Sequence, residues 1–229
     1  MKFFGIEHLS LVDYDSKLTC TIFTKSCNFR CPFCHNKDLA LSEEIEEIPF
    51  DEILNFLKNR KKYLDAVCIS GGEPTLHSDL PKIIRQIKEL GYLIKLDTNG
   101  TNPNMIKYLI ENNLLDYIAM DIKNDLAHYH ETCGVNYINL LNIQSSINII
   151  QNSNIDYEFR TTLIKEFHTI ESITNISNWL KDPKHYYLQK FKLSENCIKQ
   201  NLHEVDIDTA KTFKKILLTK FSNVSLRGY

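Results

Sequence analysis

Three cysteines lie close together in the first part of the sequence, with the spacing Cys27-x₃-Cys31-x₂-Cys34. Thiolates at this spacing can face one metal centre, and soft sulfur ligands select iron–sulfur clusters, zinc or copper(I). A closed site of four thiolates needs one more cysteine, and the remaining cysteines show no paired spacing with this group. The motif therefore predicts a metal centre with one position left for a substrate, a cofactor or water.

The number of cysteines bears on which metal is bound. A structural zinc site has four protein ligands. His35 follows Cys34 directly, and adjacent residues seldom turn both side chains onto one ion, so His35 is a poor fourth ligand. A [4Fe–4S] cluster held by three thiolates leaves one iron free to bind a cofactor. The motif favours the cluster, and a zinc-stabilised domain stays open as the alternative.

The bulk composition sets limits on the kind of protein. We expect one domain over residues 1–229, and the formal net charge of −2 supplies no electrostatic footprint for nucleic acid or an anionic membrane. No apolar run reaches a membrane-spanning length, and no secretory signal opens the chain. Seven cysteines, four of them scattered, do not resemble a disulfide framework. We expect a cytoplasmic protein with neither nucleic acid nor membrane as a partner.

Strand and helix patterns alternate along the chain. Strands are expected at 17–24, 64–70, 92–97, 116–122, 156–164 and 186–193, each followed by a helical pattern, with a short extended tail at the end of the chain. This alternation predicts a parallel sheet covered by helices. A full eight-unit barrel takes about 250 residues, so six units indicate a partial (β/α)6 barrel of the α/β class. The cysteine loop follows the first of these strands.

Polar residues gather where the expected strands end. Chemistry in parallel sheets lies beyond the carboxyl ends of the strands, so residues from separate strands are expected to form one site. Taken singly, Gly71 and Gly72 could form a turn that needs positive φ, and Asp97 and Asp121 could cap helices. The strand-end residues are Gly71, Gly72, Glu73, Asp97, Asn99, Asp121, Lys123, Arg160 and Gln189. Of the scattered cysteines, we expect Cys20, Cys68 and Cys197 in the core and Cys133 at the surface or half-buried.

The cysteine motif, with Phe33 before its last cysteine, resembles the signature of radical S-adenosylmethionine enzymes, and Ser70-Gly71-Gly72-Glu73-Pro74 is similar to their second motif. Cys34-His35-Asn36 resembles the activases that install a glycyl radical on a partner enzyme. Residues 10–17, 120–123 and 159–162 are most similar to the activating proteins of anaerobic ribonucleoside-triphosphate reductase. Asp15-Ser16 and Lys165-Glu166 depart from that subgroup where it has Pro-Gly-like turns.

The resemblance implies that Cys27, Cys31 and Cys34 hold a [4Fe–4S] cluster whose fourth iron binds S-adenosylmethionine. It implies that Glu73 and the two glycines take the methionine ammonium, and that Arg160 or Lys123 pairs the carboxylate. The other implied cofactor contacts are Asp97, Asn99 and Asp121 on the ribose and sulfonium side and Phe33 and Gln189 at the adenine.

The activity that the resemblance implies is a radical reaction on another protein. One electron from a flavodoxin or ferredoxin would cleave S-adenosylmethionine, and the radical formed would take a hydrogen atom from a glycine of the partner, here anaerobic ribonucleotide reductase. Two alternatives stay open. One is a radical S-adenosylmethionine enzyme acting on a small molecule, such as a 7-carboxy-7-deazaguanine synthase, and the other is a non-catalytic metal-stabilised binding domain.

Overall fold

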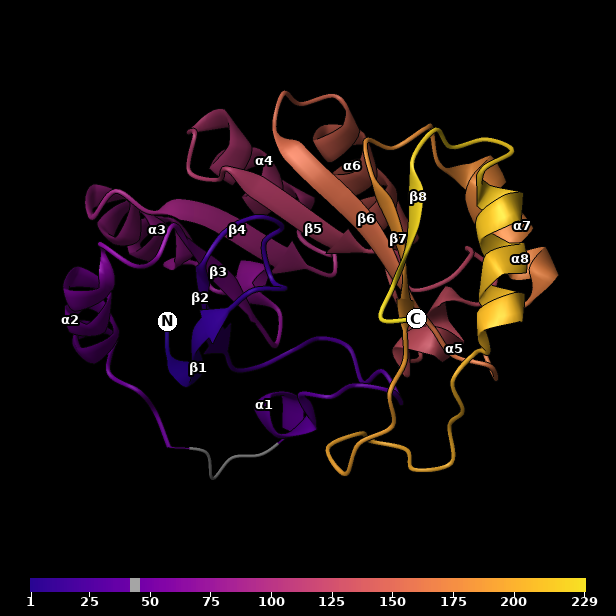
Figure 1. Cartoon of the computed structure of the whole chain (residues 1–229), viewed down its shortest axis with the longest axis horizontal. Coiled ribbons are helices and arrows are strands. Elements are labelled where there is room, and N and C mark those ends of the chain that lie inside the picture. Colours follow the sequence, from indigo (N-terminus) through magenta and orange to yellow (C-terminus); the bar gives the residue numbers. More distant parts are fainter. Residues whose placement is uncertain (42–45) are drawn as a thin grey trace.

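The computed structural model describes residues 1–41 and 46–229. Its strands form an eight-stranded sheet in the order β1-β2-β3-β4-β5-β6-β7-β8, so that β1 and β8 are the edges. Strands β2 to β8 run parallel to their neighbours, and β1 is antiparallel to β2. Figure 1 shows this sheet curving into an open barrel with helices along its outer side. The predicted fold class is therefore confirmed.

The elements have the following bounds. The strands are β1 Phe3–Ser10, β2 Thr19–Thr24, β3 Ala66–Gly71, β4 Leu93–Thr98, β5 Tyr117–Asp121, β6 Asp156–Leu163, β7 Tyr186–Lys190 and β8 Val224–Arg227. The helices are α1 Lys37–Leu41, α2 Phe50–Arg60, α3 Leu80–Glu89, α4 Pro103–Glu111, α5 Tyr129–Cys133, α6 Leu140–Gln151, α7 Ile170–Trp179 and α8 Ile207–Leu217, with a short 3₁₀ turn η1 at Pro74–Leu76.

The six predicted strands correspond to β2 through β7, and the structure adds a strand at each edge. β1 was not predicted, because its side chains are largely half-buried or exposed and give no clear alternation. The extended tail predicted at the end of the chain is β8. It is a strand because its residues Val224–Arg227 pair with β7. β1 pairs with β2, the next strand in the chain, whereas β8 depends on a partner strand more distant in sequence.

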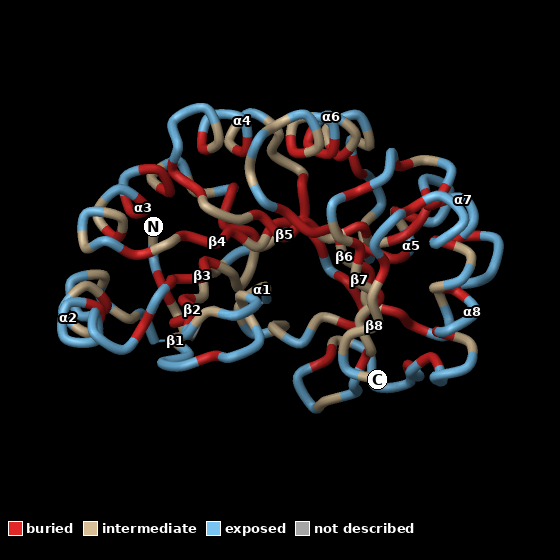
Figure 2. The backbone as a smooth tube through the Cα atoms, turned by 45° about the horizontal axis from the view of Figure 1, so that its top comes forward, coloured by how far each residue is buried: buried red, intermediate tan, exposed pale blue. Residues whose placement is uncertain are grey.

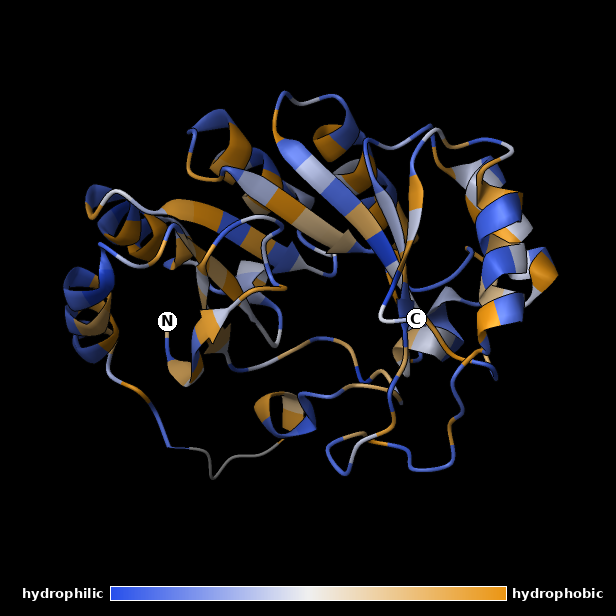
Figure 3. Ribbon diagram, viewed as in Figure 1, coloured by the Kyte–Doolittle hydropathy of each residue, from blue (hydrophilic) through white to orange (hydrophobic). Residues whose placement is uncertain are grey.

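The helices bury one apolar face against the outside of the sheet. In α3 the side chains of Leu80, Ile83, Ile84 and Ile87 are buried, and Gly91 (φ +85°) follows the helix end as predicted. Figure 2 shows buried residues concentrated in the strands and in the helix faces turned to them, and Figure 3 shows hydrophilic residues on the outward faces. Over residues 1–41 and 46–229, none of the helices is long and apolar enough to span a membrane.

The inner face of the sheet is polar where its outer face is apolar. In β4, Ile94 and Leu96 are fully buried, whereas the alternating residue Asp97 lines an inner cavity. Strand β6 repeats this pattern, with Phe159 buried and Arg160 in the cavity. A parallel sheet that follows this alternation brings charged side chains of several strands to one interior. That interior holds the candidate site.

Candidate active site

The cysteine loop follows β2 directly, and its three thiols reach the inside of the barrel. Cys27, Cys31 and Cys34 are free and line one cavity of about 510 Å³ at the carboxyl ends of the strands. A turn closed by the Cys34 N–H on the Cys31 carbonyl (3.0 Å) brings the last two together. The guanidinium of Arg30 donates to the carbonyls of Cys27 (2.6 Å) and Phe29 (2.7 Å) on the outer side. The loop is thus shaped by its own hydrogen bonds.

Two distant segments hold the cysteine loop from outside. The Arg30 N–H donates to the carbonyl of Cys133 at the end of α5 (2.9 Å), and the Lys199 N–H donates to the Pro32 carbonyl (2.8 Å). Cys133 is fully buried, so the predicted surface or half-buried position is wrong. Packing of α5 against the loop, which no local pattern indicates, accounts for its burial. The core positions predicted for Cys20, Cys68 and Cys197 are confirmed.

Gly71 and Gly72 are needed where β3 passes the start of the cysteine loop. Gly71 has φ +109°, and a Cβ there would lie 2.4 Å from the Thr24 backbone nitrogen. A Cβ on Gly72 would lie 2.1 Å from the Ser26 carbonyl oxygen. The Gly72 and Glu73 N–H groups donate to Thr24 and Ser26 carbonyls, both at 2.8 Å. Backbone packing against Thr24 and Ser26 is therefore sufficient to require glycine at both positions.

Glu73 is buried and ties the ends of β3 and β4 together. Its Oε1 accepts from the Thr75 N–H (3.1 Å), the Thr75 hydroxyl (2.5 Å) and the Thr98 hydroxyl (2.7 Å). Its Oε2 accepts from the Asn99 N–H (2.6 Å). Burial raises the pKa of this carboxyl, and these donors act against that rise. Glu73 thus positions the loop after β4, and Oε2 keeps room for another donor.

Asn99 connects that loop to the cysteines. Its amide nitrogen donates to the Asn28 side-chain oxygen (2.9 Å) and lies 3.9 Å from the Cys27 sulfur. Its side-chain oxygen accepts from the backbone and hydroxyl of Thr101, at 3.0 and 2.7 Å. These bonds hold the Asn99 side chain beside Cys27. Its predicted contact with the ribose or sulfonium side of the cofactor stays a prediction.

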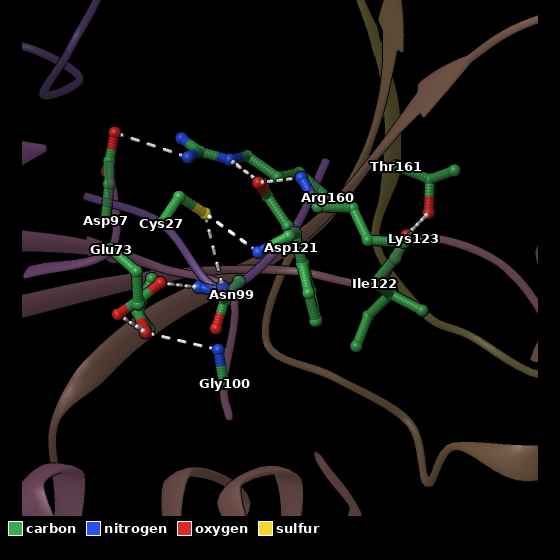
Figure 4. A network of polar contacts seen from close by, with 12 residues as sticks. Cys27, Glu73, Asp97, Asn99, Gly100, Asp121, Ile122, Lys123, Arg160 and Thr161 are labelled. Atoms are coloured by element: carbon green, nitrogen blue, oxygen red, sulfur yellow. Dashed lines mark hydrogen bonds and ion pairs between the residues drawn. The ribbon is translucent and has the colours of Figure 1, made fainter. Parts of the chain in front are cut away.

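Four charged residues form a continuous network across β4, β5 and β6 (Figure 4). The Arg160 Nε bonds Asp121 Oδ1 at 2.5 Å, and its Nη2 lies 3.2 Å from Asp97 Oδ2. Lys123 Nζ donates to Asp121 Oδ2 at 2.6 Å. Within the described residues, Asp97 Oδ1 is buried without a hydrogen-bond partner, although Lys95 Nζ lies 3.5 Å away. Cations and carboxylates alternate along the network.

This alternation keeps the groups charged inside the barrel. Burial would raise the pKa of Asp121, but Arg160 and Lys123 outweigh it and hold that pKa well below its usual range. Burial likewise opposes the charge on Lys123, and Asp121 raises its pKa above the usual value. Burial raises the pKa of the Cys27 and Cys34 thiols, while the Lys123 ammonium acts in the opposite direction on both. Lys123 Nζ lies 5.8 Å from the centre of the Phe33 ring, which places this ammonium beside the cysteine loop.

The structure brings every predicted site residue to the same cavity. The three cysteines line it together with Phe33, Gly71, Gly72, Glu73, Asp97, Asn99, Asp121, Lys123, Arg160 and Gln189. Sequence reasoning missed two charged residues of this site. Lys95 pairs with Asp97 at 3.5 Å, and Glu158 pairs with Arg160 at 3.8 Å. Each is two positions before its partner in the same strand, so the alternation of a strand was the signal available.

The residues present fit a [4Fe–4S] cluster with S-adenosylmethionine. The cavity is lined by three free thiols and by both cationic and anionic side chains. The unpartnered Asp97 Oδ1 suits a hydroxyl donor of a ligand. Among the described residues, no three His, Cys, Asp or Glu side chains are grouped as ligands of a single ion.

Comparison with known proteins agrees with this chemistry. The radical SAM superfamily model matches residues 21–176. A glycyl-radical enzyme activating enzyme of Methanocaldococcus jannaschii, MJ1227 by name, is 39% identical over 196 residues, which are 82% of this chain and 79% of that one. The pyruvate formate-lyase-activating enzyme of Staphylococcus aureus is 35% identical over 131 residues, 52% of either chain.

Among solved structures, Streptococcus suis SuiB bound to S-adenosylmethionine has the same fold, with a TM-score of 0.67 at 16% identity over 90% of this chain. This chain spans about half of SuiB, 49% of its length. Superfamily membership implies a [4Fe–4S] cluster and S-adenosylmethionine as cofactors. The chain belongs to the radical S-adenosylmethionine superfamily of enzymes and, within it, to the family of glycyl-radical enzyme activating enzymes.

Proposed function

We propose that this chain activates anaerobic ribonucleoside-triphosphate reductase by generating its glycyl radical. The observation that carries the activase function is a three-thiol loop facing a charged cavity, in a chain 39% identical over 196 residues to a named activating enzyme. The reductase as partner is supported by the similarity of residues 10–17, 120–123 and 159–162 to the activating proteins of that enzyme.

When bound, the cluster and S-adenosylmethionine would supply the one-electron cleavage and the abstraction of hydrogen from a glycine Cα. Cys27, Cys31 and Cys34 would hold the cluster, and a flavodoxin or ferredoxin would deliver the electron. All seven cysteines are free thiols, which supports a reducing, cytoplasmic setting. The protein's own residues bind and orient these groups.

Lys123 is our choice for the cofactor carboxylate. The Arg160 guanidinium already faces Asp121, Asp97 and, at 3.8 Å, Glu158. Lys123 has one carboxylate neighbour at 2.6 Å, and its Nζ lies 5.8 Å from the centre of the Phe33 ring. An ammonium has three donors, so Lys123 keeps capacity for a second carboxylate beside the cysteine loop. Arg160 then fixes the two aspartates.

The remaining contacts follow from unused capacity in the cavity. Glu73 Oε2 accepts one hydrogen bond from Asn99 and can take the methionine ammonium as a second donor. Asp97 Oδ1 can accept from a ribose hydroxyl. Phe33 and Gln189 line the cavity and are proposed for the adenine. Asp121 would hold Lys123 in place, and the backbone of Gly71 and Gly72 would border the methionine.

The test is anaerobic reconstitution followed by reaction with two candidate partners in parallel. Purified reductase or pyruvate formate-lyase is mixed with reconstituted protein, a reductant and S-adenosylmethionine, and the glycine-centred EPR doublet is measured. We expect the doublet with the reductase alone and none with the Cys31→Ala variant. A doublet with formate-lyase alone would refute the choice of partner. Turnover of a small molecule without any doublet, or a protein that takes up no iron, would refute the activase function.

A further inference from the structure

A second cavity lies at the opposite end of the barrel from the cysteines. Its volume is about 730 Å³, and it lies beside the residues that precede β2, β3 and β4, against the carboxyl-terminal end of α2. The residues that line it and those that line the active-site cavity are two separate sets. A hollow of this size can hold a small organic molecule.

Cations outnumber carboxylates around this cavity. Its lining includes four basic side chains and one carboxylate, which are Lys17, Arg60, Lys61, Lys62 and Asp65. The Asp65 carboxylate already accepts from the Leu18 N–H at 2.9 Å. Among the described residues, none of the four cations forms an ion pair. The cavity therefore carries an excess of positive charge that a bound anion would neutralise.

Local structure accounts for two of these cations. Arg60 ends α2, where a positive charge is favoured by the negative end of the helix dipole, and its guanidinium lies 5.8 Å from the centre of the Phe56 ring. Lys61 Nζ donates to the Gly91 carbonyl at 2.7 Å and lies 4.3 Å from the centre of the Tyr92 ring. Both side chains therefore have a structural role without a ligand.

Lys17 and Lys62 have no role of this kind. Within residues 1–41 and 46–229, neither ammonium forms an ion pair or lies over an aromatic ring. They come from different segments, one before β2 and one after α2, yet line the same cavity. An ammonium has three donors and binds phosphate oxygens as a compact charge. These two lysines are thus the groups that an anion would meet.

Exposed apolar side chains lie in the same cavity. Leu9, Leu18 and Tyr63 are among its lining residues and are 53%, 41% and 65% exposed. Large apolar side chains that are exposed together in a hollow suit the apolar part of a ligand. An inorganic anion would leave them in water, so the lining favours a molecule that has both an anionic and an apolar part.

We propose that this cavity binds an organic phosphate, with its phosphate groups on Lys17 and Lys62 and its apolar or aromatic part against the exposed leucines and Tyr63. Four cations and one engaged carboxylate leave an excess of three positive charges, which a chain of phosphates matches better than a single carboxylate does. The inference goes beyond the proposed function and does not depend on it, because the cavity lies away from the cysteines.

The test is equilibrium binding of ATP to the reconstituted full chain, with S-adenosylmethionine at saturation so that the active-site cavity is filled. Lys17→Gln and Lys62→Gln each remove one ammonium. Lys58→Gln is the matched control, because Lys58 is an exposed lysine of the same helix outside the cavity. We expect Kd to rise about three- to ten-fold in each cavity variant and to stay at the wild-type value in the control.

Two further probes separate the halves of the ligand. Adenosine and inorganic triphosphate should each bind more weakly than ATP. Adenosine that binds as tightly as ATP would exclude the phosphate contacts, and triphosphate that does so would exclude the apolar contacts, and either result overturns the proposal. It is also overturned if ATP does not bind, if Kd is unchanged in either cavity variant, or if the control loses as much affinity. None of these readouts involves glycyl-radical formation, so a missing radical bears on the proposed function alone.

Discussion

Replacing Gly72 with alanine tests whether backbone packing or a ligand requires glycine beside the cysteine loop. The new Cβ would lie 2.1 Å from the Ser26 carbonyl oxygen and 2.6 Å from its carbon, and backbone atoms cannot be moved aside by a rotamer change. Relief requires separating the two segments, which breaks the 2.8 Å bonds from Gly72 N–H to Thr24 and from Glu73 N–H to Ser26. At ~0.5–1.5 kcal/mol for each bond, the loss is about 1 to 3 kcal/mol.

The assay is thermal unfolding of the cluster-free protein together with iron uptake on reconstitution. For a chain of this size the expected loss lowers Tm by about 2 to 12 °C. Iron uptake should fall as well, because Cys27 follows Ser26 directly. Gly5→Ala is the matched control, since its Cβ would meet only the Phe23 side chain at 3.3 Å. A Gly72→Ala protein with wild-type Tm and iron content but weaker binding of S-adenosylmethionine would refute the packing argument and favour close approach of a ligand.

Three further predictions concern the cavity. Arg160→Gln leaves Asp97 and Asp121 without their shared cation, so the free energy of unfolding measured in urea should fall by about 3 kcal/mol. Lys123→Gln should lower it less, because Arg160 still pairs with Asp121. Equal losses in the two variants would contradict the network. Because the pKa of Asp121 is depressed in the folded state, its stabilisation is complete above the unfolded pKa of about 3.9 and is lost as the pH falls below it. The free energy of unfolding should therefore decline below about pH 4, and Asp121→Asn should decline less steeply; parallel curves would exclude this role. Alanine at Cys27, Cys31 or Cys34 should abolish iron uptake, whereas Cys20→Ala should keep it, and retention by any of the first three would remove that cysteine from the ligand set.

The sequence predicted the part of the site that local pattern and parallel topology determine. The ends of parallel strands share one edge of the sheet, so Asp97, Asp121 and Arg160 could be placed together without coordinates. Their pairing could not be foreseen in detail. Whether Arg160 or Lys123 is engaged by carboxylates depends on side-chain directions across three strands, and only the distances of the structure separate the two.

Features that rest on contacts between distant segments escaped prediction. β8 is four residues long, and pairing with β7 rather than its own pattern makes it a strand. Cys133 approaches Arg30 across about a hundred residues of chain, and nothing near it in the sequence indicates that contact. For Glu73 the residue was predicted, but its structural role was not. Its motif was recognised, but most of its hydrogen-bonding capacity serves Thr75, Thr98 and Asn99.

The charge network explains how a barrel can carry a polar interior before any cofactor arrives. A buried charge without a partner is costly, whereas in this chain each charge faces an opposite one: Lys95 with Asp97, Arg160 with Asp97 and Asp121, and Lys123 with Asp121. S-adenosylmethionine carries both positive and negative groups, so each of them can bind beside a side chain of opposite charge. Lys123 is the end of the network that lies beside Phe33 of the cysteine loop, and among the described residues it pairs with one carboxylate, so it can accept a second one with little rearrangement. A cofactor carboxylate placed there lies beside the cysteine loop, where the open metal position is expected.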